Sequence, residues 1–258
     1  MSIKTTLTNN HIQNNGRCID FAGHQLPVWF TNQKDEHLAV RNKVGMFDIS
    51  HMGLIEISGT GADDFLSTLS CNRISAALNQ KMIYSMFCND QGMILDDVMF
   101  GKLNNRWHLV VNGANRTKIR HWLNEHQPTD VQIKELNDEF TFIAVQGPES
   151  PTVLSTVFNS AIIDCPRFGM MSQPFEDASC LLTRTGYTGE DGFEIMVPNH
   201  KAENLWNALK DAGVTPCGLA CRDSLRIEFG LPLYGQELSE HIHPFITRYA
   251  WVVKFDHD

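Results

Sequence analysis

Two successive rounds of strand, helix, further strands and helix run along this 258-residue chain, and their order restricts the folds open to it. The first round comprises a strand at 54–58, a helix at 61–70, strands near 82–88, 94–102 and 106–112, and a helix at 115–126. The second comprises a strand at 140–146, a helix at 149–158, strands near 179–184 and 192–198, and helices at 200–212 and 220–229. A parallel sheet requires strict alternation between strand and helix, and neither round has it. The pattern therefore predicts an α+β fold with mainly antiparallel sheets.

The composition is that of a globular protein, and it argues against several classes of function. Hydrophobic residues make up 42% and charged residues 20% of the chain, so the apolar material suffices for well-buried cores. No apolar run approaches the roughly 18 residues that a membrane-spanning helix needs, and the N-terminus lacks the apolar core of a secretory signal. A net charge of -9 argues against a nucleic-acid surface, which is normally basic. We expect a cytoplasmic protein with no membrane or nucleic-acid partner.

The seven cysteines do not have the spacing of a metal or redox site. No C-x-x-C pair occurs, and Cys217 and Cys221 have no second pair of cysteines or histidines near them in sequence. We expect all seven to be reduced thiols, most of them buried. His241 and His243 could be metal ligands, but no carboxylate or cysteine completes a set. The sequence therefore predicts no metal.

Two adjacent carboxylates, Asp96 and Asp97, interrupt the apolar strand near 94–102. Successive side chains of a strand point to opposite faces, so the two should not serve one site together. One of them would face a cleft, where a carboxylate needs a hydrogen bond, an ion pair or a ligand. The alternative is two solvated residues on an edge strand or a bulged strand, and periodicity does not choose between these interpretations.

A turn with three glycines, at 186–192, leads into the strand near 192–198. Glycines permit backbone conformations and close approaches that larger residues forbid. In that strand Phe193 and Ile195 share one face, which places Glu194 on the other. Glu194 therefore faces either a ligand or, in an ordinary hairpin, solvent.

Basic side chains gather on two of the predicted helices. Arg222 and Arg226 fall on one face of the last helix, and an arginine offers a planar fork of donors suited to carboxylates and flat polar rings. Ion pairs with Asp223 or Glu228, or plain exposure, are the usual explanation for such arginines. The basic run at 116–121 could dock an acidic partner, although such a run is more often the solvated face of its helix.

A series of short motifs is more informative in its order than any one motif alone. In chain order these are Ile19-Asp-Phe-Ala-Gly23, Leu26-Pro-Val28, Glu36-His-Leu-Ala-Val-Arg41, Gly45-Met-Phe-Asp-Ile-Ser-His-Met52, Ile94-Leu-Asp-Asp97, Val110-Val-Asn112, Ala144-Val-Gln-Gly-Pro148, Thr185-Gly-Tyr-Thr-Gly-Glu190, Pro216-Cys-Gly-Leu-Ala-Cys-Arg-Asp-Ser-Leu-Arg226 and Leu233-Tyr-Gly-Gln-Glu237. From about residue 17 to residue 256, the ordered set resembles the aminomethyltransferase family, the T-proteins of the glycine cleavage system.

The resemblance implies an enzyme, an aminomethyltransferase with tetrahydrofolate as its co-substrate. Its partner would be the lipoyl carrier H-protein, whose dihydrolipoyl arm bears the aminomethyl group left after glycine decarboxylation. The one-carbon unit would pass to tetrahydrofolate, giving 5,10-methylenetetrahydrofolate and ammonia. This chemistry calls for an anion that holds the folate nitrogen and the cationic carbon in register. A folate-dependent demethylase and a non-catalytic folate-binding protein of the same superfamily are the alternatives.

The resemblance also assigns residues to the site. Asp96 matches the family's catalytic aspartate, Glu194 the carboxylate that accepts hydrogen bonds from the pterin ring, and Arg222 the arginine that contacts folate. Three further positions match residues that line the same channel: Tyr84, Asn112 and Tyr187. The expected site thus has one catalytic and five folate-binding side chains.

The family fold gives the two rounds of elements a domain organisation. It implies two interleaved α/β lobes around a central folate channel. Residues 1–50 and 138–245 would form the first, folate-binding lobe, and 51–137 the second lobe, which carries the catalytic aspartate. Residues 246–258 would begin a linker to a C-terminal β domain that is absent from this sequence. On this expectation the chain is a fragment or a short paralogue, and its catalysis is weak.

Overall fold

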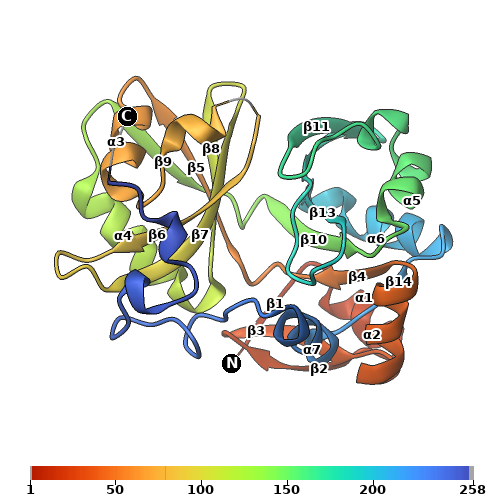
Figure 1. The fold of residues 1–258 in the computed structure, drawn as a ribbon. Helices are drawn as coiled ribbons and strands as arrows, with labels where there is room; N and C mark the ends of the chain where they lie inside the picture. The colour runs from red at the N-terminus through yellow and green to blue at the C-terminus, as the bar shows by residue number, and fades with distance from the viewer. Residues whose placement is uncertain (1, 79, 256–258) are drawn as a thin grey trace. The chain divides into compact units, whose positions relative to one another are not determined.

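The computed structural model describes residues 2–78 and 80–255, which form two compact units (Figure 1). Unit 1 combines the residues up to His51 with Asp138–Leu231, and unit 2 combines Met52–Asn137 with the described residues from Pro232 on. Each unit is therefore built from two separate stretches of chain. The fold is α+β with three sheets whose strands pair mostly antiparallel, as predicted. No described helix is both long enough and apolar enough to cross a lipid bilayer.

Unit 1 contains two sheets, with the strand orders β1-β3-β2 and β11-β12-β13-β10-β4-β14. Its strands are β1 (Ile3–Lys4), β2 (Arg17–Phe21), β3 (His24–Trp29), β4 (Gly45–Asp48), β10 (Phe140–Gln146), β11 (Met170–Phe175), β12 (Ala178–Thr183), β13 (Gly192–Pro198) and β14 (Thr215–Pro216). Its α-helices are α1 (Thr8–Gln13), α2 (Gln33–Asn42), α5 (Ser150–Val157), α6 (Ala202–Asp211) and α7 (Leu219–Phe229). Leu154 of α5 and Trp206 of α6 pack with Phe193 of the large sheet in one core. That core anchors β13, which carries Glu194.

Unit 2 contains one antiparallel sheet with the strand order β6-β7-β8-β5-β9 (Figure 1). Its strands are β5 (Gly53–Gly59), β6 (Ile83–Cys88), β7 (Ile94–Leu103), β8 (Arg106–Val111) and β9 (Val131–Glu135), and its α-helices are α3 (Ala62–Leu69) and α4 (Arg116–His126). Phe65 of α3 and Ile119 of α4 share a core with Phe100 and Trp107 of the sheet. Both helices therefore pack against the sheet through one core and hold β7, the strand that carries Asp96.

The ends of the helices follow the chemistry of the flanking residues. Asn32 precedes α2, and its side chain accepts a 2.9 Å hydrogen bond from the backbone N–H of Asp35. Asp63 and Asp64 occupy the first turn of α3, as expected for residues near a positive helix end. Gly230 ends α7 in the left-handed conformation at φ 78°, which glycine adopts without strain.

The units end at different residues from the lobes expected from the sequence. The described residues after Leu231 belong to unit 2, whereas 138–245 was assigned to the first lobe and 246–258 to a linker. Contacts within unit 2 account for the difference. Leu238 and Val252 pack in one core with Ile94 of β7, and Ile94 also donates its backbone N–H to Ile242.

Candidate functional site

Asp96 lies on β7 and is completely buried. Asn112 Nδ2 and Asn115 Nδ2 donate to its Oδ1 at 2.9 and 2.6 Å, and the backbone N–H of Asn112 donates to its Oδ2 at 3.0 Å. Both asparagines lie between the end of β8 and the start of α4. The described donors to this carboxylate are all amides, so none of them brings a positive charge.

Asp97 shares one of these donors with Asp96. Asn112 Nδ2 lies 2.8 Å from Asp97 Oδ1, as well as 2.9 Å from Asp96 Oδ1. Tyr84 donates its hydroxyl to Asp97 Oδ2 at 3.1 Å. The prediction that the two carboxylates cannot serve one site together is therefore wrong. They form one cluster with Tyr84 and Asn112, two of the side chains expected in the site.

Beside the two carboxylates, the pairing of β7 is irregular towards β6, and it is absent towards β8. On β6, Phe87 pairs with Asp96. The next residue of β6, Cys88, pairs with Ile94, which leaves Leu95 as an extra residue of β7. Asp96 and Asp97 lie after this bulge and pair regularly with Phe87 and Met86. The ladder between β7 and β8 ends at Met99 and Val110, so the Asn112 side chain lies beyond it and reaches both carboxylates.

Burial and mutual repulsion raise the pKa values of the carboxylate pair. Burial raises the pKa of Asp96 to about 7, and the charge of Asp97 adds to this rise, while hydrogen bonds from Asn112 and Asn115 oppose it. Burial likewise raises the pKa of Asp97 to about 6, against hydrogen bonds from Tyr84 and Asn112. Because the two carboxylates interact, they gain and lose protons as a pair near neutral pH.

In unit 1, Glu194 lies half-buried on β13, while Phe193 and Ile195 point into the core, as predicted. Thr185 donates its hydroxyl to Glu194 Oε2 at 2.6 Å. No described side chain donates to the other carboxylate oxygen. Burial raises the pKa of Glu194, although the charge of Arg222 and the hydrogen bond from Thr185 oppose the rise. The carboxylate thus keeps one oxygen available to a ligand donor.

Arg222, on α7, is buried and stacks on Tyr187, with its guanidinium carbon 4.8 Å from the centre of the ring. Its Nη1 is buried and has no hydrogen-bond partner among the described residues. Burial lowers the pKa of Arg222, against the attraction of Glu194 and Tyr187. A buried donor without an acceptor is costly. The acceptor oxygen of a polar ligand would remove that cost.

Gln146, buried at the end of β10, fixes the glycine-containing turn that carries Thr185 and Tyr187. Its Nε2 donates to the carbonyl of Thr185 at 3.1 Å, and Thr188 donates its hydroxyl to Gln146 Oε1 at 3.0 Å. A Cβ atom on Gly186 would lie 1.8 Å from Gln146 Oε1, so a larger residue at this position would displace the Gln146 amide. The glycine pattern seen in the sequence therefore reflects a close approach of the turn to one amide.

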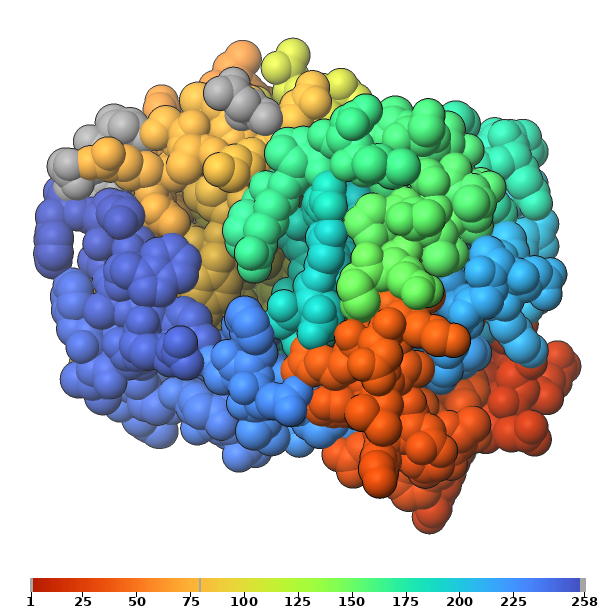
Figure 2. Space-filling model, turned by 45° about the vertical axis from the view of Figure 1, so that its right-hand side comes forward, coloured from red at the N-terminus to blue at the C-terminus, as the bar shows by residue number. Residues whose placement is uncertain are grey.

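Arg41 of α2 holds the same turn from outside. Its Nη1 donates to the carbonyl of Thr188 at 2.7 Å and to Glu190 at 2.9 Å, and its Nη2 donates to Glu228 of α7 at 2.6 Å. Figure 2 shows α2, in orange, beside this turn, in cyan, on the surface of unit 1. The turn is thus fixed by Gln146 on one side and Arg41 on the other.

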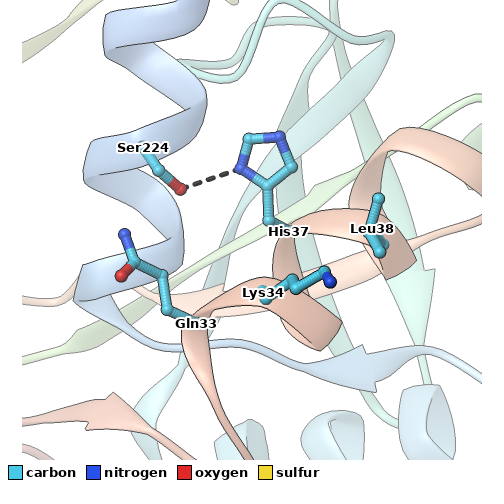
Figure 3. A pocket seen from close by; sticks show the side chains of 5 residues that line it. All are labelled: Gln33, Lys34, His37, Leu38 and Ser224. Carbon is cyan, nitrogen blue, oxygen red and sulfur yellow. Dashed lines mark hydrogen bonds between the residues drawn. The ribbon is translucent and has the colours of Figure 1, made fainter.

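A surface pocket lies on α2 and α7 (Figure 3). The residues that line it are Gln33, Lys34, His37, Leu38 and Ser224. His37 Nδ1 lies 2.8 Å from Ser224 Oγ, and His37 Nε2 lies 3.1 Å from Glu228 Oε2. These contacts join the two helices. None of the predicted site residues lines the pocket.

Several charged residues singled out in the sequence take part in ion pairs. Arg226 Nε lies 2.8 Å from Asp223 Oδ1, which confirms the ion-pair alternative for this arginine. In the basic run at 116–121, Lys118 lies 2.6 Å from Glu240, and Arg120 lies 3.3 Å from Glu135. These two side chains are therefore engaged within unit 2.

Three buried side chains of unit 1 could together hold a metal ion. Glu36, Cys217 and Cys221 place their ligand atoms within 4.8 Å of one another. The sequence showed no further ligand near the two cysteines, because Glu36 lies far away along the chain. Glu36 Oε1 already accepts the backbone N–H of Phe30 at 2.6 Å, and its Oε2 accepts that of Gly218 at 2.8 Å. The carboxylate therefore closes two buried loops, and its oxygens are occupied.

Sequence reasoning missed three residues that position the expected site side chains: Asn115, Thr185 and Gln146. A signal existed for two of them. Asn115 is the second asparagine in Asn112-Gly-Ala-Asn115, and Gln146 is a polar residue at the end of an otherwise apolar strand. Thr185 carries no such signal, because a threonine before a glycine turn is common.

The chain is similar to several aminomethyltransferases over nearly its whole length. It is 39% identical over 254 residues to the aminomethyltransferase of Staphylococcus epidermidis, covering 97% of this chain and 70% of that protein. It is 40% identical over 260 residues to the aminomethyltransferase of Thermoanaerobacter sp. (strain X514), covering 98% of this chain and 71% of that protein. The crystal structure of the glycine cleavage system aminomethyltransferase T from Bartonella henselae matches with a TM-score of 0.88 at 32% identity, covering 99% of this chain and 70% of that one.

These similarities place the chain in the class of proteins that have the α+β fold of aminomethyltransferase T. The GCVT N-terminal domain model matches residues 7–257, and the chain belongs to this family, the T-proteins of glycine cleavage. The resemblance found in the ordered motifs is therefore confirmed.

Proposed function

We propose that the protein is a tetrahydrofolate-dependent aminomethyltransferase of glycine cleavage. It would transfer the one-carbon unit from the aminomethyl-dihydrolipoyl arm of an H-protein to tetrahydrofolate, with release of ammonia. The family binds folate and works with the H-protein, which supports both assignments. When bound, tetrahydrofolate supplies the ring nitrogen that receives the carbon.

The observation that carries the proposal is the buried Arg222 guanidinium, whose Nη1 has no acceptor among the described residues. A flat, polar ring with carbonyl oxygens fits such a donor, because a guanidinium is planar and its N–H groups are fixed in direction. Tyr187 stacks on the same guanidinium and holds it in place. The residues thus fit the polar, aromatic head of a folate.

Glu194 would bind the donor edge of the same ring. A carboxylate accepts two adjacent N–H donors well, and Thr185 leaves one of its oxygens uncommitted. Burial raises the pKa of Glu194, so its ionised form lacks full stabilisation in the free protein. Ligand N–H donors would supply that stabilisation, which makes Glu194 a binding residue.

Asp96 would serve the transfer step. Its ionised carboxylate, held by Asn112 and Asn115, would stabilise the positive charge that develops on the transferred carbon. Its pKa of about 7 allows it to accept a proton near neutral pH as well. Asn112 and Tyr84 orient the carboxylate pair and are positioning residues in this scheme.

Calorimetric titration with tetrahydrofolate tests the proposal. Glu194→Ala should weaken binding by about 10- to 100-fold, because the ring donors lose a charged acceptor. Glu176→Ala removes a carboxylate of the same unit that contacts Lys201, and it should leave the affinity unchanged. No binding to the folded chain, or equal affinities of the wild type and Glu194→Ala, would overturn the assignment.

A further inference from the structure

Unit 2 holds two cysteines whose sulfur atoms touch. Cys71 Sγ and Cys88 Sγ lie 3.5 Å apart, and both side chains are half-buried. Cys88 is the last residue of β6. Cys71 lies beside that strand and donates its backbone N–H to the carbonyl of Met86. The two thiols therefore come from neighbouring, hydrogen-bonded stretches of backbone that hold them together.

The other thiols of the chain differ from this pair. Four of them are buried: Cys165, Cys180, Cys217 and Cys221. Cys217 and Cys221 also lie close together, but the hydrogen bond with Cys221, together with burial, raises the pKa of Cys217 well above its ordinary value. Cys18 is half-buried like Cys71 and Cys88, but it lies on β2 of unit 1. Cys71 and Cys88 thus combine a contact between their sulfur atoms with partial exposure of both side chains.

The electrostatics assign different roles to the two sulfurs. The hydrogen bond from Cys88 lowers the pKa of Cys71, although burial opposes this. The same hydrogen bond, with burial, raises the pKa of Cys88. Since the thiolate is the reactive form, Cys71 is the sulfur that reacts first with an oxidant. Cys88 is then in place to react with the product.

We propose that Cys71 and Cys88 form a reversible disulfide, which makes them an oxidation site for hydroperoxides. The Cys71 thiolate attacks one oxygen of hydrogen peroxide, breaks the O–O bond and becomes a sulfenic acid, with hydroxide leaving. The Cys88 sulfur then attacks the Cys71 sulfur, loses its proton and displaces the second hydroxide, which leaves as water. In total, two thiols and one peroxide give one disulfide and two waters.

The modification has a structural consequence at the carboxylate pair. Cys88 lies at the register shift of the β6–β7 ladder, next to Phe87, the partner of Asp96. Two thiols 3.5 Å apart must approach further to form a bond of about 2.0 Å. That movement acts on Phe87 and so on its partner Asp96, whose carboxylate accepts a hydrogen bond from Asn112. Oxidation should therefore change the surroundings of the Asn112 amide, whether or not the proposed function is correct.

Peptide mapping after mild oxidation tests the proposal. The folded chain is treated with an equimolar amount of hydrogen peroxide, free thiols are alkylated, and the digest is analysed by mass spectrometry. We expect a peptide pair linked through Cys71 and Cys88 that dithiothreitol separates, with Cys217 and Cys221 still alkylated. Alkylation of both Cys71 and Cys88 in the folded, treated chain, or a disulfide that joins Cys217 to Cys221 first, would overturn it.

Two variants and one spectroscopic signal sharpen the result. In Cys88→Ser the reaction should stop at the Cys71 sulfenic acid, which dimedone traps, whereas Cys18→Ser should oxidise like the wild type. The side-chain amide resonance of Asn112 should shift on oxidation of the wild type and return after reduction. An unshifted resonance in the disulfide form would contradict the effect on the carboxylate pair. A dimedone adduct on Cys88 in place of Cys71 would contradict the order of the steps.

Discussion

The two units bury charge in opposite ways. In unit 1 the carboxylate of Glu194 and the guanidinium of Arg222 attract each other, and each opposes the pKa shift that burial imposes on the other. In unit 2 Asp96 and Asp97 repel each other, and their donors are neutral amides and a phenol. One unit therefore pairs unlike charges, and the other pairs like charges.

The difference separates binding from proton chemistry. Unlike charges limit the cost of burial while a donor and an acceptor stay available, which suits the recognition of a neutral polar ring. Like charges increase affinity for protons and cations, which suits the stabilisation of a cationic carbon. If this division is correct, changes in unit 1 should alter affinity, and changes in unit 2 should alter turnover.

Asp96→Asn should have the largest effect. Without an ionised carboxylate, turnover with the aminomethyl-loaded carrier should fall by about 100- to 1000-fold, while the affinity for tetrahydrofolate stays the same. Single-turnover kinetics and calorimetry measure the two quantities. Equal turnover of the variant and the wild type would remove Asp96 from the catalytic step and break the comparison.

The folding of this variant needs its own control. An amide nitrogen in place of Asp96 Oδ2 would face the backbone N–H of Asn112, so we expect a loss of stability of about 1–3 kcal/mol. A circular dichroism melt shows whether the variant is folded at the assay temperature.

Arg222→Lys should have the next largest effect, this time on affinity. Lysine keeps the charge but loses the planar fork and its stacking on Tyr187. We expect folate binding to weaken by about 5- to 30-fold. Arg226→Lys is the matched control, because Arg226 is buried on the same helix but pairs with Asp223. Equal losses in both variants would show that α7 is only a structural element.

Asp97→Asn should change the titration of Asp96. The charge of Asp97 raises the pKa of Asp96, so its removal should lower that pKa below about 7. The contacts of the side chain can persist, because an asparagine oxygen still accepts from Asn112 and the Tyr84 hydroxyl can accept as well as donate. Carbon-13 NMR of the Asp96 carboxyl group measures the shift, and an unchanged midpoint would show that the two groups do not interact.

The same variant tests how the free energy of unfolding depends on pH. The pKa values of the pair rise from the ordinary 3.8 to about 7 and about 6 on folding, so the folded chain binds protons more tightly than the unfolded chain across this range. The contribution of the pair to the free energy of unfolding therefore decreases as pH rises from about 4 to 7. Denaturant titrations should show a smaller decrease for Asp97→Asn, and parallel curves would contradict the prediction.

Thr185→Val should have the smallest effect. It removes the 2.6 Å hydrogen bond to Glu194, raises the pKa of that carboxylate further and weakens folate binding. We expect a loss of about 0.5–1.5 kcal/mol, or roughly 2- to 10-fold in affinity. Thr141→Val, which removes a hydroxyl bonded to Asn199 in the same unit, should not change the affinity.

The fold was predictable where apolar residues follow a regular period. The strands and helices predicted for both rounds match observed elements to within a few residues, but the strands β9 and β11 were not predicted. The sequence predicted no element before residue 50, although α2 and β4 are there. In α2 only Glu36 and Val40 are buried, and β4 is four buried residues long. Neither segment has the period that reveals an element, since tertiary contacts determine its structure.

The candidate site was predictable in its residue types but not in its geometry. Periodicity correctly placed Glu194 on the face of its strand that points away from the core. It wrongly predicted that the carboxylates of Asp96 and Asp97 would not lie in one cluster. The error lies at the end of the β7–β8 ladder, because beyond Met99 and Val110 the Asn112 side chain bonds to both carboxylates and no local sequence signal marks where the ladder ends. Gln146 and Asn115 stand out in the sequence, but their roles could not be predicted, since only folding brings them near the Thr185 carbonyl and the Asp96 carboxylate.

The interleaving of the two units affects the synthesis of the protein. β4 pairs with β10, so the large sheet of unit 1 cannot close until the roughly 90 residues between them have left the ribosome, which takes about 5–20 s. Unit 2 in turn waits for Leu238 and Val252 to complete its core beside Ile94. The edge of β4 therefore remains open during translation. Binding of a chaperone to the nascent chain would have its greatest value in that interval.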